Sequence, residues 1–181
     1  HSTVAYNSAA CDHGAYTPGQ QVKITYFGNL GDGRSEELLR LAQVLSRIDP
    51  ALVLDIYGNA LPEAAEAFSQ RENIRYYGFV DAAALHGIVE KSDILLHVES
   101  FEEAMIPKLK YAFSTKIAQC LCAGRCFVSF APGGSASSRY LQEAEGALPV
   151  SDEKELEQLL RKLVNDPALR QSYAQKAAAT G

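Results

Sequence analysis

A stretch of the chain from Ala104 to Gln142 carries five basic side chains and no acidic one, so all 22 acidic residues lie outside it. Because the formal net charge of the whole chain is -5 at pH 7, this stretch is a locally positive segment of an acidic protein. Fixed cations without neighbouring carboxylates are suited to holding an anion such as a phosphate. We therefore expect this basic segment to face an anionic ligand. Its basic residues are Lys108, Lys110, Lys116, Arg125 and Arg139.

The middle of the basic segment is predicted to form a short helix that begins where the positive charge lies. Ser114 or Thr115 is suited to cap the start of this helix, and Gly124 is suited to end it. The apolar run Cys126–Phe130 then predicts a buried strand. A lysine in the first turn opposes the helix dipole unless an anion shares the site. Lys116 is therefore a candidate anion ligand, although a solvated helix face also explains it.

A second candidate anion site is the glycine-rich segment Gly28–Arg34, which lies between a predicted strand and a predicted helix. Backbone amides and the helix dipole can hold a phosphate at such a place. The G-x-x-G-x-G order is neither the dinucleotide fingerprint nor a P-loop, which ends in Gly-Lys-Ser/Thr. A flexible strand-to-helix turn is an equal alternative, but Arg34 at the helix start favours an anion site.

The sequence leaves open the roles of His97, at the end of a predicted strand, and of the glutamates that follow it. His97 has the pattern of a hydrogen-bonded core histidine more than that of a base. Glu99, Glu102 and Glu103 could bind sugar hydroxyls or be solvated. The four cysteines and four histidines lack the spacing of a metal site, so we expect no metal.

The elements that must position these residues alternate between strand-like and helix-like segments. This alternation predicts right-handed crossovers and a parallel sheet covered on both faces, which is a doubly wound, Rossmann-like α/β fold. The predicted strands are Val22–Phe27, Leu52–Tyr57, Ile74–Tyr77, Asp93–Val98, Cys126–Phe130 and Ala147–Val150. The predicted helices, besides the one after Ser114, are Ser35–Arg47, Pro62–Ser69, Ala82–Lys91, Ala136–Glu143, Glu153–Val164 and one that starts at Pro167.

Ligands of such sheets bind beyond the carboxyl ends of the strands, where the strand order switches. The loops that follow the predicted strands are therefore the places to look for a site. They are Gly28–Arg34, Gly58–Asn59, Gly78–Val80, the long loop Glu99–Phe113 with Ser114, and Ala131–Ser138.

Length and composition fit one domain. With 181 residues and 47% apolar content the chain can fill a core. Residues 1–20 are polar and are predicted to be a linker or disordered arm, which leaves residues 21–181 as the domain. The acidic balance argues against nucleic-acid binding. Because no segment resembles a membrane span or a secretory signal, we expect a cytoplasmic protein. The start at His1 suggests a cut fragment or the remnant of a tag.

Several short segments, in a fixed order, resemble the C-terminal, donor-binding lobe of GT-B glycosyltransferases, particularly the retaining enzymes of glycosyltransferase family 4. The resemblance covers about residues 22–178 and implies one Rossmann-like lobe of a GT-B fold. It implies transfer of a sugar from a nucleoside-diphosphate sugar to a glycan, lipid or other acceptor, as in bacterial polysaccharide biosynthesis. The segments that carry it are Tyr26–Asn29, Gly58, Asn73–Ile74, Tyr77–Val80, Lys91–Leu96, Phe113–Ile117 and Ala123–Gly124.

The resemblance assigns donor-diphosphate contacts to residues at matching positions. In the family a first-strand Gly-Arg and a lysine that opens the next helix hold the diphosphate. Here Gly28 is followed by Asn29, and the lysine position is taken by Arg34, so one cation is lost and one is exchanged. A subset of the family has a Ser-Thr-Lys-Ile helix start, which implies diphosphate contacts for Ser114, Thr115 and Lys116.

The resemblance also implies contacts to the base, the sugar and the ribose. A glycine-aromatic-valine turn lets the backbone read the base, which implicates Gly78, Phe79 and Val80. The paired glutamates of the family, which touch the sugar and the ribose, correspond to Glu102 and Gln119. Here the gap between them is nine residues longer than the family pattern and the second acid is an amide.

The implied reaction uses neither a metal nor a cofactor, and it assigns no catalytic residue. Negative charge grows on the departing nucleoside diphosphate, and fixed cations with helix amides stabilise that charge. Two alternatives stay open: a non-catalytic nucleotide-sugar binding module, favoured by Asn29 and Gln119, and a sugar-nucleotide 2-epimerase lobe, disfavoured by the acid-free segment. In such enzymes an acceptor-binding lobe precedes this one, and we expect that lobe to be missing here. We expect the chain to be inactive alone and any peripheral membrane association to run through the missing lobe.

Overall fold

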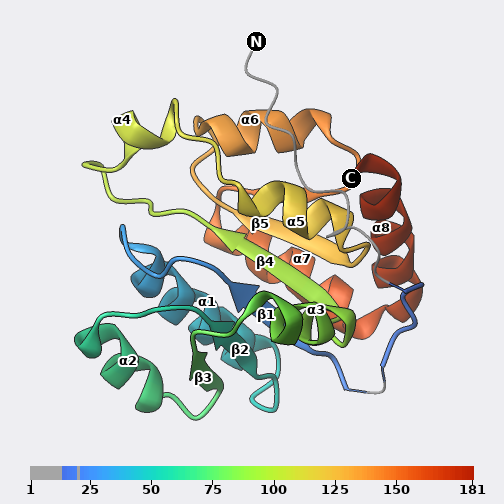
Figure 1. Ribbon diagram of the computed structural model, residues 1–181, viewed down its shortest axis with the longest axis horizontal. Helices are drawn as coiled ribbons and strands as arrows, with labels where there is room; N and C mark the ends of the chain where they lie inside the picture. Colours follow the sequence, from blue (N-terminus) through green and yellow to red (C-terminus); the bar gives the residue numbers. More distant parts are fainter. Residues whose placement is uncertain (1–13, 20) are drawn as a thin grey trace.

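Six parallel strands form one sheet at the centre of the fold (Figure 1). The computed structural model describes residues 14–19 and 21–181. The strand order is β3-β2-β1-β4-β5-β6, in which the direction of winding reverses between β1 and β4. The predicted doubly wound, Rossmann-like architecture is confirmed. The strands are β1 (Ile24–Phe27), β2 (Leu54–Tyr57), β3 (Ile74–Gly78), β4 (Ile94–Val98), β5 (Cys126–Phe130) and β6 (Leu148–Val150).

Helices cover both faces of this sheet (Figure 1). Residues of α1 and α7 pack against one face, and residues of α3, α5 and α6 pack against the other. The helices are α1 (Arg34–Ile48), α2 (Pro62–Ser69), α3 (Ala82–Glu90), α4 (Ile106–Leu109), α5 (Lys116–Cys122), α6 (Ala136–Glu143), α7 (Glu153–Asn165) and α8 (Pro167–Thr180).

The alternation of side chains along the central strands divides the core into two layers. In β4, Leu96 and Val98 join the layer beneath α1 and α7, whereas Leu95 joins the layer beneath α3 and α5. The five residues of β4 are all buried, as expected for a strand covered on both faces. Strands held in this way place the loops that follow them at a fixed edge, where the polar residues of interest lie.

Predicted and observed elements agree in type and order, with one addition. The predicted bounds Pro62–Ser69, Cys126–Phe130 and Ala136–Glu143 are those of the structure. The predicted long loop Glu99–Phe113 is wrong in part, because it contains the one-turn helix α4. Pro107 lies in the first turn of α4, where a missing backbone N–H costs nothing.

The helix of the basic segment, α5, begins at the predicted lysine. Its N-cap residue is Thr115, but the Thr115 side chain makes no capping hydrogen bond. Ser114 Oγ instead accepts a hydrogen bond from the Lys116 amide at 3.4 Å. Gly124 follows the helix with a φ of +58°, which confirms it as the residue that ends α5.

The described part of the predicted N-terminal arm lies against the domain. The Tyr16 hydroxyl donates a hydrogen bond of 2.6 Å to Asp93, and the Gly19 amide donates one of 3.2 Å to the same carboxylate. The rest of the predicted arm, residues 1–13 and 20, lies outside the described residues. Within residues 14–19 and 21–181, no helix combines the length and the apolar character needed to cross a bilayer.

Candidate functional site

The crevice at the switch in strand order, between β1 and β4, is the candidate site. The loops after these two strands diverge, because β1 leads toward β2 on one side and β4 leads toward β5 on the other. Two cavities, of about 300 Å³ and about 260 Å³, lie at this edge. Phe27, Asn29 and Lys116 line both of them, so the candidate site extends to either side of these residues.

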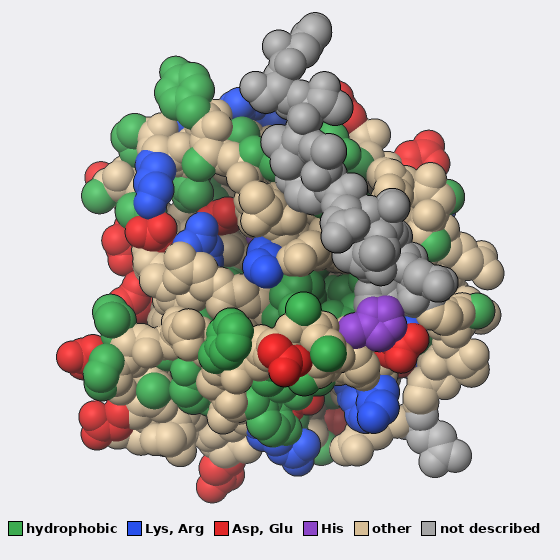
Figure 2. Space-filling model, viewed as in Figure 1, with side chains coloured by type: hydrophobic (Ala, Val, Ile, Leu, Met, Phe, Trp, Pro, Cys, Tyr) green, Lys and Arg blue, Asp and Glu red, His purple; other side chains and the backbone are tan. Residues whose placement is uncertain are grey.

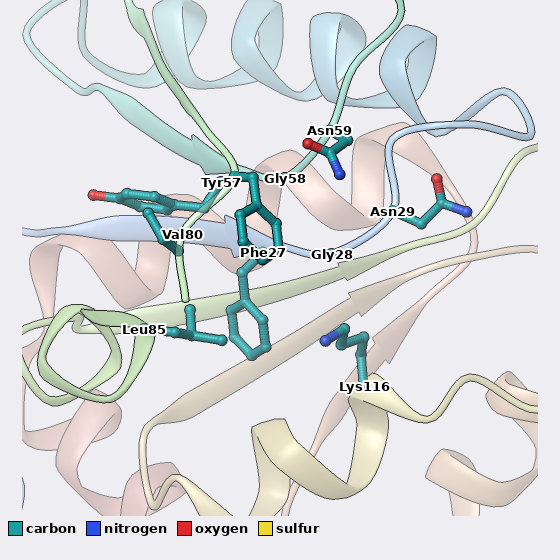
Figure 3. Close-up of a pocket in the computed structure, with 10 residues that line it drawn as sticks. Phe27, Gly28, Asn29, Tyr57, Gly58, Asn59, Val80, Leu85 and Lys116 are labelled. Atoms are coloured by element: carbon teal, nitrogen blue, oxygen red, sulfur yellow. The ribbon is translucent and has the colours of Figure 1, made fainter. Parts of the chain in front are cut away.

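The first cavity has an apolar end and a polar end (Figure 3). Phe27 lies between the two ends, and Phe79, which is 70% exposed, contributes to the rim. A cavity of this kind suits a ligand with a flat apolar part and a charged part. The apolar end is formed by Tyr57, Val80 and Leu85, and the polar end by Asn29, Asn59 and Lys116.

Two strand-end glycines shape the first cavity by their close approach. A Cβ atom on Gly58 would lie 2.0 Å from the carbonyl oxygen of Gly28, and both glycines have a φ of +147°. Backbone hydrogen bonds tie the ends of the three strands together: Gly28 N donates to Tyr57 O at 3.0 Å, and Gly58 N donates to Gly78 O at 2.8 Å. Only glycine at position 58 permits this packing, which holds the loops in register.

A pair of stacked tyrosines supports the apolar end of the first cavity. The Tyr57 and Tyr77 rings lie 4.7 Å apart with an interplanar angle of 6°. Burial, with the nearby negative charge of Asp55, raises the pKa of Tyr57 to about 12. Tyr57 therefore stays neutral at physiological pH and presents an aromatic, uncharged surface.

Lys116 is the cation shared by the two cavities. Its ammonium donates a hydrogen bond of 2.9 Å to Gln119 Oε1 and lies 5.4 Å from the centre of the Phe27 ring. Among the residues that the structure describes, no carboxylate forms an ion pair with Lys116. A cation that has an amide and an aromatic ring as neighbours keeps its full charge for an incoming anion.

Arg34 lines the second cavity but is held by carboxylates. Its guanidinium donates a hydrogen bond of 2.6 Å to Glu99 and lies 3.6 Å from Asp32. The Asp32 carboxylate also forms a 2.9 Å ion pair with Lys108. Arg34 and Lys116 face the same cavity, as the anion hypothesis requires. An anion at Arg34 nevertheless has to share the guanidinium with Glu99.

A buried chain of polar side chains behind Arg34 connects β4 with β5. Glu99 accepts from Arg34 and contacts His97 Nε2 at 3.2 Å, while His97 Nδ1 contacts Ser129 Oγ at 2.9 Å. Burial raises the pKa of Glu99, but the hydrogen bond to His97 and the charge of Arg34 outweigh it and bring the pKa below its usual range. Glu99 is thus an ionised carboxylate inside the protein, and it fixes the position of Arg34.

Most of the predicted ligand residues lie at these cavities. Gly28, Asn29, Phe79, Val80 and Lys116 line the first cavity, and Asn29, Arg34, Ser114, Thr115 and Lys116 line the second.

Three of the predicted ligand residues lie outside both linings. Gly78 shapes the turn through its carbonyl bond to Gly58, and Gln119 holds the Lys116 ammonium. Glu102 lies near the start of α1, where burial and the Glu102 charge raise the pKa of Glu36. The ligand roles of these three residues stay predictions.

Several residues at the site carry no role in the sequence reasoning. Asn59 and Leu85 line the first cavity, and the sequence offered a signal only for Asn59, as a strand-following residue. Glu99 was one of three carboxylates with an open role. Glu99 follows His97 by two residues in the chain, and their buried side chains are in contact. A buried polar group needs a hydrogen-bond partner, and each of these two side chains supplies one for the other.

Within the described parts of the chain, no group of three or more histidine, cysteine, aspartate or glutamate side chains is placed to hold a metal ion.

Comparison with known proteins gives one family and one fold. A family model described as glycosyl transferase-like matches residues 34–180. No curated protein sequence matches the chain. Among solved structures, the chain is similar to WaaG, a glycosyltransferase involved in lipopolysaccharide biosynthesis, with a TM-score of 0.66 and 17% identity over 89% of this chain. It is also similar to the Anabaena protein HepE, solved with UDP-glucose, with a TM-score of 0.66 and 16% identity over 88% of this chain.

The chain covers a much larger share of a solved single domain than of the longer solved chains. The chain spans 43% of the WaaG chain and 43% of the HepE chain. It spans 96% of the C-terminal domain of a group 1 family glycosyl transferase (LpcC) from Francisella tularensis, with a TM-score of 0.68 and 15% identity over 97% of this chain. At these identities the likeness shows the fold, which is that of a GT-B lobe.

Proposed function

The chain belongs to the glycosyl transferase-like family, and we propose that it is the donor-binding lobe of a retaining glycosyltransferase. The donor is a nucleoside-diphosphate sugar, and the acceptor is a glycan, lipid or other hydroxyl-bearing molecule bound by a further lobe. The observation that carries the proposal is the position of Lys116, a cation without a carboxylate partner in the described structure. It lies at the polar end of the first cavity and also lines the second.

The two cavities divide the donor into parts. A base fits the apolar end of the first cavity, where Tyr57, Val80 and Leu85 supply flat and aliphatic surface. The diphosphate follows at the polar end beside Lys116, and the sugar then extends into the second cavity. HepE, which shares this fold, was solved with UDP and with UDP-glucose, and this supports the same ligand class here.

The residues of the chain stabilise the departing diphosphate through fixed charge. As the glycosidic bond breaks, the leaving phosphate gains negative charge, and a prepositioned ammonium lowers the energy of that state without reorganisation. Lys116 supplies this charge directly, whereas Arg34 supplies a charge that Glu99 partly neutralises. The ion pair with Glu99 holds the Arg34 guanidinium in place beside the second cavity.

A non-catalytic nucleotide-sugar binding module is the second candidate, and the neutralisation of Arg34 by Glu99 favours it. The two candidates differ in chemistry but not in ligand. Incubating the whole enzyme with a labelled nucleotide sugar separates them, since transfer or hydrolysis excludes an inert module.

Calorimetric titration tests the donor site itself. It compares the affinities of UDP, GDP and ADP with those of the corresponding nucleosides. We expect one diphosphate to bind and its nucleoside to bind more weakly. If none of the three binds at millimolar concentration, the donor-site proposal is wrong.

A further inference from the structure

Asp32 combines an unusual backbone conformation with a position in the lining of the second cavity. Its φ is +57°, and among the residues that the structure describes it is the only one other than glycine with a positive φ. Residues that carry a side chain rarely adopt this conformation, and where they do the surrounding structure holds them in it. A residue held in this way at a ligand cavity is a candidate for a functional role, and the donor-site proposal gives Asp32 none.

Two basic side chains hold the Asp32 carboxylate at this cavity. Lys108 of α4 donates a hydrogen bond of 2.9 Å to Asp32 Oδ2, and Arg34 Nη1 lies 3.6 Å from the same oxygen. In Figure 2, basic and acidic side chains lie together on the surface between α4 and the start of α1. The hydrogen bond from Lys108 lowers the pKa of Asp32, so this carboxylate is ionised at neutral pH. The Asp32 side chain remains 39% exposed, so a ligand in the cavity can reach it.

The charges around the second cavity leave one cation for a ligand. Glu99 neutralises the charge of Arg34, and Lys108 neutralises that of Asp32. Lys116 is then the one cation, among the described residues that line this cavity, without a carboxylate partner. Each phosphate of a nucleoside-diphosphate sugar carries a negative charge at neutral pH. The diphosphate therefore exceeds this free positive charge, and the described lining has no cation left to balance a further anion.

The guanidinium of Arg34 is not free to bind a carboxylate on the donor. Its Nη2 donates a hydrogen bond of 2.6 Å to Glu99, and its Nη1 donates one of 3.3 Å to the carbonyl oxygen of Gly31 and faces Asp32. A carboxylate on the sugar would have to displace one of these partners, and it would then lie beside the charge of Asp32. Like charges at such short separations repel each other even where water weakens the interaction.

From these observations we propose that Asp32 is a specificity-determining residue that excludes acidic sugars from the second cavity, so that the donor carries a neutral sugar. This inference rests on the proposed function, since it takes the donor sugar to lie in that cavity. Neutral sugars suit the same place, because their hydroxyl groups can donate hydrogen bonds to the exposed carboxylate. The charges that carry the inference all belong to this chain, so the chain itself can be tested.

A pair of donors that differ only at the sixth carbon of the sugar tests this proposal. UDP-glucose carries a hydroxymethyl group there and UDP-glucuronate a carboxylate, so the ratio of their dissociation constants reports the effect of the charge. Calorimetry on the unmodified chain should find that UDP-glucuronate binds about tenfold more weakly. This ratio should shrink as the salt concentration rises from about 0.1 M to about 0.5 M. If GDP or ADP is the nucleotide that binds, the same two sugars are carried on that nucleotide.

Two variants should move the ratio in opposite directions. Asp32→Asn removes the charge but keeps the size of the side chain, and asparagine also adopts a positive φ, so the ratio should fall to about twofold or less. Lys108→Gln removes the partner that neutralises Asp32, so the ratio should rise about threefold. Glu155→Gln, on the exposed face of α7, is the matched control and should leave the ratio unchanged. Circular dichroism verifies that every variant is folded.

Several results would overturn the role of Asp32. These are equal affinities for the two donors, an unchanged ratio in Asp32→Asn, or the same change of the ratio in Glu155→Gln. UDP, which lacks the sugar, separates this inference from the donor-site proposal. If UDP binds and the ratio for the unmodified chain is close to one, only the role of Asp32 is wrong. If no nucleoside diphosphate binds, both proposals are wrong.

Discussion

A series of glycine-to-alanine substitutions separates the two constraints that build the first cavity. Gly58 combines a positive φ with a close approach, since a methyl group on its Cα would lie 2.0 Å from Gly28 O, whereas Gly78 has a φ of +73° and nothing within 4 Å of that methyl position. Gly87, in α3, has neither constraint. Alanine at position 58 therefore tests steric clash together with backbone strain, and alanine at position 78 tests backbone strain alone. Alanine at position 87 is the control without either constraint.

The magnitudes follow from these three environments. Placing a side chain at positive φ costs about 1 to 2 kcal/mol, so Gly78→Ala should lower the free energy of unfolding by that amount. Gly58→Ala must also displace the Gly28 backbone, which brings the total to about 3 to 5 kcal/mol. Gly87→Ala should raise stability by about 0.5 to 1 kcal/mol, because alanine favours the helix.

Urea denaturation followed by circular dichroism measures the series. If the free energies of unfolding of Gly58→Ala and Gly78→Ala differ by less than about 0.5 kcal/mol, the close packing of Gly58 on Gly28 adds no cost and the explanation is refuted. A difference of that size is within the usual error of additivity. A folded Gly58→Ala protein should also lose nucleotide binding, since the Gly28 loop has to move away from Tyr57.

The remaining predictions concern charge. Glu99→Gln should lower the free energy of unfolding by about 1 to 3 kcal/mol at neutral pH, because it leaves Arg34 and His97 without their buried anion. Since the folded pKa of Glu99 lies below its unfolded value, this stabilisation is present above about pH 4.3 and is lost as pH falls further. Urea denaturation of both proteins between pH 7 and pH 3 measures it, and a constant difference would contradict the assignment. Glu153→Gln breaks exposed ion pairs with Arg40 and Arg47, so it should change stability by less than about 1 kcal/mol, and raising the salt concentration should remove even that effect.

The fold follows from the sequence because periodicity reports burial. The run from Cys126 to Phe130 is buried at every position, and its β-branched and aromatic residues between Gly124 and Pro132 identify it as a central strand. Helix α4 was not predicted, because a helix of a single turn is too short to show a periodic pattern of apolar residues.

The candidate site was predictable as a set of short segments, but not as contacts between residues far apart in the sequence. Ser114, Thr115 and Lys116 stand together and were identified from their charge and capping pattern. The pairing of Arg34 with Glu99 joins residues 65 positions apart, and only the strand order brings β1 and β4 together. Sequence spacing could indicate that Arg34 faces an anion, but it could not show that this anion includes a carboxylate of the protein itself.

The affinity of the diphosphate for Lys116→Ala tests the central claim most directly. We predict that calorimetry finds about tenfold to a hundredfold weaker binding of the preferred nucleoside diphosphate, the value of one charged hydrogen bond, with the affinity of the nucleoside unchanged. Lys154→Ala, on the exposed face of α7, is the matched control and should bind both ligands normally. Equal diphosphate affinities of Lys116→Ala and the unmodified chain would contradict the account.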